Sequence, residues 1–223
     1  MTDTGLPQMV IDARDVTLTL GDTPVLRGIS LSVARGESVA LLGSSGSGKS
    51  SLMAVLTGLE RASGGRVIVD GLDFTTLGED ALARARRGRI GIVLQAFHLL
   101  PTMTARENVA VPLELAGVTD AWSRAGEELA AVGLAHRMDH YPSQMSGGEQ
   151  QRVAIARALA SRPPIVFADE PTGNLDTATG ERVMDLLFAR QGALGTTLIV
   201  ITHDHALAAR CDRTVTLADG QVR

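Results

Sequence analysis

The sequence predicts an α/β fold, in which helices cover a mostly parallel sheet, antiparallel strands form one edge and a helical segment is inserted. Short apolar runs alternate with helical patterns along the 223 residues, and this order is typical of a parallel sheet. Residues 38–42, 165–168 and 198–201 are almost continuously apolar, as expected of strands that are buried on both faces. Across residues 96–160 the apolar positions instead recur at helical spacing.

The first half of the chain contributes mainly strands. Residues 10–20 and 25–33 form short apolar runs that are separated by a Gly-Asp turn, which predicts two antiparallel edge strands. A buried strand over residues 38–42 then meets a loop rich in glycine and serine. The elements that follow are a helix over residues 49–56 with Gly58 as its C-cap, and strands over residues 66–69 and 90–94.

The second half is mainly helical before it returns to buried strands. Its predicted elements are helices over residues 105–116, 121–132 and 148–161, a strand over 165–168, a helix over 179–191, a strand over 198–201 and a hairpin of residues 214–217 and 221–222. We therefore expect one domain over residues 1–223. In this interpretation, residues 1–95 and 161–223 form the core with its antiparallel edge, and residues 96–160 form a helical subdomain.

The composition excludes several classes of protein. The chain is 44% hydrophobic and 21% charged, which is ordinary for a globular domain and excludes a disordered or collagen-like chain. A net charge of −4 argues against a nucleic-acid partner. Cys211 is the single cysteine and allows no disulfide within the chain. No apolar run reaches the roughly 20 residues of a membrane-spanning helix, and residues 1–15 lack the apolar stretch of a signal peptide, so we expect a cytoplasmic location.

Lys49 stands out among the basic residues. The chain has 21 lysines and arginines, and Lys49 is the only lysine. Because arginine carries a rigid planar fork and lysine a compact charge on a flexible stem, a single retained lysine indicates a position that a guanidinium does not suit. The sequence around Lys49 is therefore the first candidate for a functional site.

The loop before Lys49 fits the phosphate-binding pattern G-x-x-x-x-G-K-[ST], with a buried strand before it and a helix after it. Its glycines let backbone N–H groups surround a phosphate, and the helix N-terminus adds a positive field. We expect Lys49 to reach the β- and γ-phosphates and the Ser50 hydroxyl to bind Mg²⁺; the alternative is a flexible Gly/Ser turn. The predicted nucleotide contacts of this loop are Gly43, Ser44, Ser45, Gly46, Ser47, Gly48, Lys49, Ser50 and Ser51.

Two adjacent acidic residues, Asp169 and Glu170, follow the apolar strand over residues 165–168. Ligands of open α/β sheets bind at the carboxyl ends of the strands. We expect Asp169 to hold Mg²⁺ and Glu170 to act on the attacking water as general base. Adjacent acids in a solvated turn are the alternative interpretation.

A second glycine-containing motif begins at Ser146. Ser146 and Glu149 have the spacing of a capping box, so one interpretation is a capped helix without further function. Gly147 and Gly148 leave the N-terminus of this helix open to an anion. Since the Lys49 loop already supplies one such terminus, we expect the second to close on the phosphate from another subunit.

Together these motifs resemble those of the ATP-binding-cassette (ABC) ATPases, and the resemblance covers nearly the whole chain. Residues 146–150 resemble the signature motif, Gln95 the Q-loop glutamine, residues 174–176 the D-loop and His203 the switch histidine. The resemblance implies a RecA-like P-loop NTPase core, ATP and Mg²⁺ as ligands, and an ATP-dependent head-to-tail dimer. It also implies that Gln95, Glu170 and His203 are catalytic, that Gln95 is a further Mg²⁺ ligand, and that Asp176 and residues 146–149 contact the nucleotide site.

Smaller details resemble one branch of the family. Leu100-Pro101, residues 104–109 and residues 168–176 are similar to the cassettes of lipoprotein release and macrolide export, including the YbbA group. Such cassettes attach to an integral membrane permease at the inner face of the membrane. The alternatives are a soluble ABC ATPase not coupled to transport and a regulatory module without turnover. Leu20 departs from the family pattern, because an aromatic ring near the end of the first strand often stacks on adenine there.

Overall fold

The computed structural model describes residues 8–223. The predicted absence of a signal peptide concerns residues 1–15, and of these residues 1–7 lie outside the described residues. The chain divides into two compact units, one of residues up to Arg86 with Thr197–Arg223 and one of Arg87–Thr196. Each unit combines helices and strands, which confirms the predicted α/β class. No helix among residues 8–223 has the length and apolar character needed to cross a bilayer.

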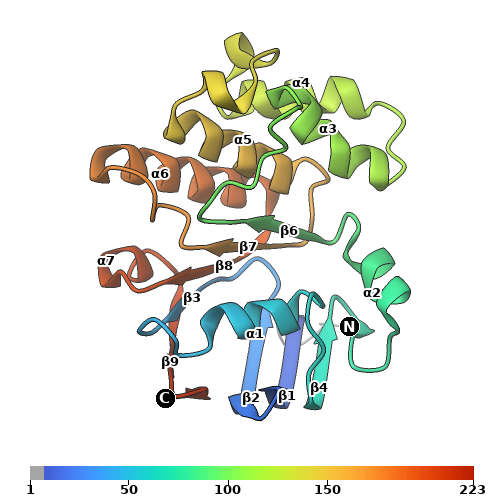
Figure 1. The fold of residues 1–223 in the computed structure, drawn as a ribbon, viewed down its shortest axis with the longest axis vertical. Coiled ribbons are helices and arrows are strands. Elements are labelled where there is room, and N and C mark those ends of the chain that lie inside the picture. Colours follow the sequence, from blue (N-terminus) through green and yellow to red (C-terminus); the bar gives the residue numbers. More distant parts are fainter. Residues whose placement is uncertain (1–7) are drawn as a thin grey trace, which may run out of the picture. The chain divides into compact units, whose positions relative to one another are not determined.

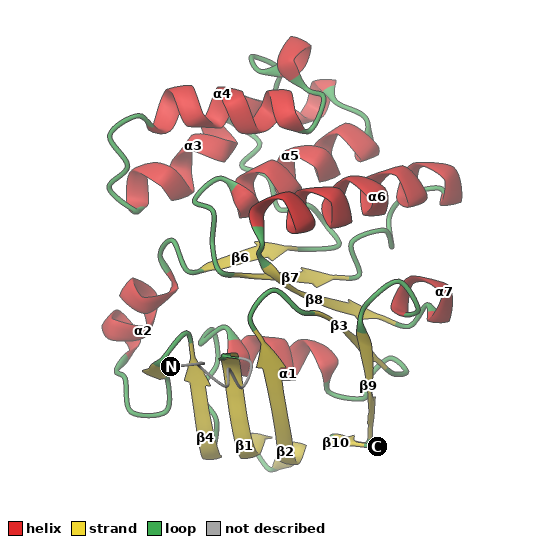
Figure 2. Ribbon diagram, turned by 180° about the vertical axis from the view of Figure 1, so that it is seen from behind, coloured by secondary structure: helices red, strands yellow, loops and turns green. Residues whose placement is uncertain are grey.

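The first unit contains the predicted antiparallel edge as a four-stranded sheet in the order β2-β1-β4-β5. Its strands are β1 (Met9–Leu20), β2 (Thr23–Ala34), β4 (Gly64–Val69) and β5 (Leu72–Asp73). In Figure 2, β1, β2 and β4 lie side by side, and α1 (Lys49–Leu56) packs against β1 and β2. The large side chains of Ile11, Leu18 and Ile29 are fully buried in this layer, so the sheet and the helix share an apolar core.

The same unit holds the strands that carry the loop with Lys49, in the order β10-β9-β3-β8. These are β3 (Ser38–Leu42), β8 (Thr197–Thr202), β9 (Arg213–Ala218) and β10 (Gln221–Val222). β3 runs parallel to both β8 and β9, and β10 closes an antiparallel hairpin with β9. All five residues of β3 and all six of β8 are buried, as their apolar sequences predict.

The second unit pairs two parallel strands, β6 (Ile90–Val93) and β7 (Ile165–Asp169), with four helices. The helices are α3 (Ala105–Leu115), α4 (Ala121–Ala131), α5 (Gly147–Leu159) and α6 (Thr177–Leu194). Figure 1 shows α3, α4 and α5 beside one another, with α6 next to α5. At Gly91 a side chain has no space, because a Cβ atom would lie 2.2 Å from the carbonyl oxygen of Ala158 on α5. This glycine lets β6 lie directly against the helix.

The sequence predicts the bounds of the long elements to within about three residues, and it misses most of the short ones. The helices α2 (Glu79–Arg86) and α7 (His205–Ala208) and the 3-10 helices η1 (Ala135–Arg137) and η2 (Pro142–Gln144) have too few turns for a clear periodic pattern. One cap prediction was wrong. Thr57 is the C-cap of α1, and Gly58 follows it in the left-handed conformation, at φ 68°.

Candidate functional site

The phosphate-binding loop of the first unit has the backbone that its glycines predict. Gly46 and Gly48 adopt φ values of 79° and 102°, a region in which side chains are strained. The Lys49 ammonium donates hydrogen bonds to the carbonyl oxygens of Gly43 and Ser44, each at 2.8 Å. Lys49 is only 7% exposed. The ammonium therefore lies inside the curve of the loop and braces it.

This loop also fits a phosphate chemically. The hydroxyl oxygen of Ser47 is buried and makes no hydrogen bond within the described part of the chain. A buried polar atom without a partner carries a desolvation cost that a ligand can remove. Gly43 lets the loop lie directly against β9, because a Cβ atom would lie 2.3 Å from the carbonyl oxygen of Leu217. An ammonium, a buried hydroxyl and a helix N-terminus together suit a polyphosphate.

His203 follows the strand beside the one that leads into this loop. β3 and β8 are parallel, and their last residues, Leu42 and Thr202, are direct partners. The loop that begins at Gly43 and the exposed His203 therefore both start at the same edge of the sheet. The first unit brings together two of the predicted motifs in this way.

The second unit brings together another group of predicted residues. β6 and β7 are parallel, with Val93 opposite Ala168, so Gln95, Asp169 and Glu170 follow neighbouring strand ends. Glu170 has a φ of 44°, which is uncommon for a residue with a side chain, and its carbonyl oxygen accepts a hydrogen bond from the N–H of Gly173 at 3.0 Å. The chain thus turns sharply directly after β7.

The stretch after this turn lies against Gln95. The side-chain amide of Asn174 donates to the carbonyl oxygen of Gln95 at 3.0 Å, and a Cβ atom on Gly173 would lie 2.5 Å from Gln95 Nε2. Asp176 caps α6 by accepting from the N–H of Thr179 at 3.0 Å. Hydrogen bonds from the hydroxyl and the N–H of Thr179 lower the pKa of Asp176. The carboxylate therefore stays ionised at the helix N-terminus, where the dipole favours it.

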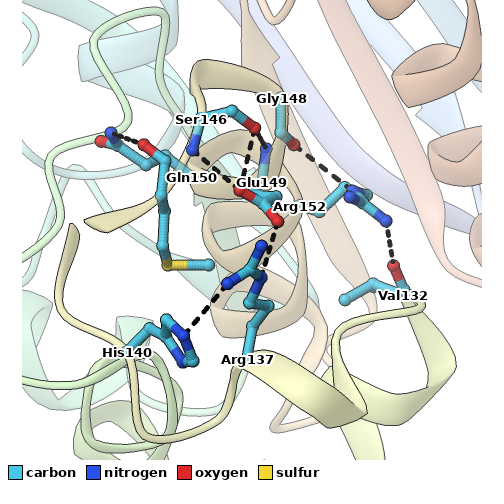
Figure 3. A network of polar contacts seen from close by, with 9 residues as sticks. Val132, Arg137, His140, Ser146, Gly148, Glu149, Gln150 and Arg152 are labelled. Atoms are coloured by element: carbon cyan, nitrogen blue, oxygen red, sulfur yellow. Dashed lines mark hydrogen bonds and ion pairs between the residues drawn. The ribbon is translucent and has the colours of Figure 1, made fainter. Parts of the chain in front are cut away.

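Ser146 forms the predicted capping box at the start of α5 (Figure 3). The Ser146 hydroxyl accepts from the N–H of Glu149 at 3.3 Å, and Glu149 Oε2 accepts from the N–H of Ser146 at 2.8 Å. The backbone N–H of Ser146 is the main cause that lowers the pKa of Glu149, and the Ser146 hydroxyl and the Arg137 charge lower it further. Both ends of the box are thus held in one geometry.

Two arginines that were not predicted as site residues complete this network (Figure 3). Arg137 donates from Nε to Glu149 Oε1 at 3.0 Å. Its Nη1 atom donates to Nε2 of His140, also at 3.0 Å. Arg152 donates to the carbonyl oxygens of Val132 at 3.2 Å and of Gly148 at 3.4 Å. Arg137 belongs to a 3-10 helix distant in sequence from Glu149, so no local pattern could have identified the pair.

The two signature glycines have different surroundings. A Cβ atom on Gly148 would lie 2.5 Å from the Thr179 methyl group on α6, whereas one on Gly147 would meet only Leu175 at 3.4 Å and Phe97 at 3.7 Å. Gly148 therefore permits close packing of α5 on α6, a role that the sequence did not predict. A pocket of about 390 Å³ opens beside these residues and is lined in part by Ser146, Gly148, Arg152, Thr179 and Arg182.

The family comparison matches residues 26–173 to the model described as ABC transporter, which covers more than half of the chain. The chain belongs to the ABC transporter family. This ABC ATPase is 51% identical over 201 residues to the uncharacterized ABC transporter ATP-binding protein YbbA of Escherichia coli K12, covering 89% of this chain and 88% of that protein. It is 52% identical to the lipoprotein-releasing system ATP-binding protein LolD 2 of Caulobacter vibrioides, covering 91% and 90%.

Solved structures agree with this assignment. The dimeric, post-hydrolysis structure of the ATP-binding cassette MJ0796 bound to ADP and Pi has a TM-score of 0.86 and 39% identity, covering 96% of both chains. The macrolide export ATP-binding/permease protein MacB of Syntrophobacter fumaroxidans is 48% identical, but this ABC ATPase covers only 31% of its length. The predicted resemblance and the P-loop core are confirmed, and the chain binds and hydrolyses ATP.

Each residue that the sequence predicts as a Mg²⁺ ligand has a suitable side chain. Ser50, Gln95 and Asp169 offer a hydroxyl, an amide oxygen and a carboxylate, which are the hard oxygen ligands that Mg²⁺ prefers. Nowhere in residues 8–223 do three or more His, Cys, Asp or Glu side chains gather as a metal-binding group. Mg²⁺ in nucleotide sites commonly takes one or two protein ligands, with phosphate oxygens and waters as the rest.

Proposed function

We propose that this chain is the cytoplasmic ATPase subunit of a membrane transport or mechanotransmission complex. In this proposal two copies close on ATP, and their closing and opening drive an integral membrane permease to which they attach from the inner face. The named relatives that serve lipoprotein release or combine an ATP-binding part with a permease support this partner. Residues 96–160 would then be the helical subdomain, which carries the signature motif, and residues 1–95 with 161–223 the core.

Each predicted residue has a distinct task in hydrolysis. Lys49 and the N–H groups of residues 43–51 bind the phosphates, and Ser50, Gln95 and Asp169 hold Mg²⁺. Mg²⁺ held there would neutralise the negative charge that develops on the phosphate oxygens. Glu170 accepts a proton from the attacking water as general base, and His203 contacts the reacting phosphate. Asp176 orders the start of α6 next to the dimer contact.

One observation carries the head-to-tail dimer. A single chain has two helix N-termini suited to a phosphate, one after the Lys49 loop and one after Ser146. Both termini can contact a nucleotide if each site is shared between two copies. One copy then supplies the Lys49 loop, and the other supplies Ser146, Gly147, Gly148 and Glu149. Two-fold symmetry then produces two identical sites, and the dimeric structures of MJ0796 support such an assembly.

A mixed dimer tests this arrangement. One chain carries Lys49→Ala and the other Ser146→Arg, and Glu170→Gln in both chains slows hydrolysis so that bound ATP can be counted. If the sites form between copies, both lesions fall in one site and the other site is intact. We then expect one trapped ATP per mixed dimer and none in either homodimer. Differently tagged chains, purified through both tags, supply the sample.

A matched control separates blockage from general damage. Ser143 is exposed and lies three residues before Ser146, so a Ser143→Arg homodimer should trap ATP as the parent does. A mixed dimer that traps no ATP, although the parent dimer traps it readily, would rule out sites shared between copies. The permease is tested separately, by mass spectrometry of the proteins that co-purify with the tagged chain from detergent-solubilised membranes.

A further inference from the structure

The turn that follows β6 has an unusual backbone. Phe97 and His98 are consecutive and both adopt left-handed conformations, with φ values of 61° and 46°. Residues with side chains seldom enter this region, and a consecutive pair is rarer still. The turn is closed by hydrogen bonds from the N–H of Phe97 to Leu94 at 3.2 Å and from that of His98 to Ala96 at 2.6 Å. Such a conformation persists when surrounding contacts hold it.

Arg157, in the last turn of α5, supplies that contact. One terminal nitrogen donates to the carbonyl oxygen of His98 at 2.6 Å and the other to that of Phe97 at 2.8 Å. The planar guanidinium can serve two carbonyls at once, which a lysine ammonium cannot do in the same geometry. Burial lowers the pKa of Arg157, and no ion pair with a carboxylate is found for it within residues 8–223. This half-buried guanidinium therefore binds backbone carbonyls.

The turn held by Arg157 begins at Gln95. On the other side of Gln95, Asn174 donates to its carbonyl oxygen, and Gly173 leaves space for its side chain. Gln95 is thus held from two sides. The stretch after β7 contacts it on one side, and on the other side it is followed by the turn in which the carbonyl groups of Phe97 and His98 both accept hydrogen bonds from Arg157. Arg157 lies on α5, the helix that begins at the signature motif.

We propose that Arg157 is a positioning residue for ATP hydrolysis, acting through Gln95. The inference rests on the proposed role of Gln95 as a catalytic and Mg²⁺-binding residue. Both hydrogen bonds found for Arg157 within residues 8–223 go to the backbone of this turn, so its removal should misplace Gln95 without changing the Lys49 loop. Removal of an outer contact behind a ligand commonly costs about 10–100-fold in activity or metal affinity.

The test compares Arg157→Ala, Arg157→Lys, Gln95→Ala and the double variant Gln95→Ala/Arg157→Ala. Arg157→Ala should lower kcat by about 10–100-fold and raise the Mg²⁺ concentration for half-maximal rate. The affinity for ATP measured in EDTA should change by less than about twofold, because the Lys49 loop is unchanged and no metal ion is present for Gln95 to hold. The double variant should be no slower than Gln95→Ala, since residues acting through one another are not additive.

Two further measurements distinguish positioning from general destabilisation. Arg124 on α4 donates to the carbonyl of Ala160 at the end of the same helix, at 2.8 Å, so Arg124→Ala removes a similar contact and should hydrolyse ATP normally. Amide hydrogen exchange at residues 96–98, without nucleotide or metal, should accelerate in Arg157→Ala and Arg157→Lys but not in Arg124→Ala. If Arg157→Ala does not fold, the same cycle is run with Arg157→Lys.

The outcomes separate the inference from the function on which it rests. If Gln95→Ala hydrolyses ATP like the parent, the proposed role of Gln95 fails and the inference fails with it. If Gln95→Ala is impaired but the two substitutions are additive, or exchange at residues 96–98 is unchanged, only the role of Arg157 is overturned. Non-additive loss with faster exchange supports it.

Discussion

The Nζ atom of Lys49 lies 2.8 Å from the carbonyl oxygen of Gly43, six residues earlier in the same loop. A second hydrogen bond of the same length joins it to Ser44. An ammonium has three donors, so the loop occupies two of them and one remains for a ligand. A compact cation can stand inside the loop in this way, and this explains why a chain with one lysine has it here.

Lys49→Arg tests that explanation, because it keeps the charge and changes only the shape of the cation. The guanidinium is planar and larger, and Lys49 is buried at 7% exposure, so the loop must open to admit it. We expect the affinity for ATP to fall at least about tenfold, or 1.4 kcal/mol, measured by calorimetric titration. Arg27→Lys, the reverse exchange on exposed β2, is the control and should bind as the parent does. Parent-like ATP binding by Lys49→Arg would make the single lysine a coincidence.

The sequence was sufficient for those parts of the site that are local in the chain. The strand, loop and helix around Lys49 and the capping box at Ser146 depend on residues within about ten positions, and both were predicted with their bounds nearly correct. Contacts between distant segments were not predictable. Arg137 reaches Glu149, and Arg157 reaches a turn 59 residues earlier at His98. Neither pairing follows from periodicity or from a motif.

Gly148 provides a second prediction. Its missing Cβ would lie 2.5 Å from the Thr179 methyl group, so Gly148→Ala should destabilise the fold by about 1–3 kcal/mol through overpacking. Thr179→Ser removes that methyl group and keeps the hydroxyl, and should restore much of the loss when combined with Gly148→Ala. Urea unfolding of the three variants measures both effects.

A second helical glycine is the control for this experiment. Gly192 on α6 has nothing within 4 Å of its missing Cβ, so Gly192→Ala should stabilise the protein by up to about 1 kcal/mol. A loss of stability in Gly148→Ala beside a gain in Gly192→Ala would distinguish an effect of packing from an effect of helix propensity. Equal stabilisation by both alanines would show that α5 can move away from Thr179 without cost.

The capping box makes stability depend on pH in a defined direction. Hydrogen bonds from Ser146 and the charge of Arg137 lower the folded-state pKa of Glu149. A lowered carboxyl pKa contributes stability above the unfolded-state value, about 4.5, and this contribution is lost as the pH falls through the folded-state pKa. Glu149→Gln should therefore be about 1 kcal/mol less stable than the parent at pH 7.

The difference should shrink as the pH falls below the unfolded-state value of about 4.5, and it should vanish once the carboxylate of the folded parent is itself protonated. Urea unfolding at a series of pH values measures it. Glu127→Gln, at an exposed position of α4, should show almost no difference at any pH. A gap between Glu149→Gln and the parent that stays constant with pH would contradict the role of the charge.

Leu20 leads to a prediction about the nucleotide base. It is the last residue of β1, its side chain is 48% exposed, and it offers no ring at the position where the family often stacks one on adenine. Without a ring, base identity should matter little, so we expect kcat/KM for GTP within about tenfold of ATP, a gap of roughly 1.4 kcal/mol.

Leu20→Tyr should strengthen nucleotide binding, since stacking of a base on an aromatic contributes about 1–3 kcal/mol. Leu59, also exposed in the first unit at 57%, supplies the control, and Leu59→Tyr should leave binding unchanged. A strong ATP preference in the parent, or equal effects of the two tyrosines, would show that another residue reads the base.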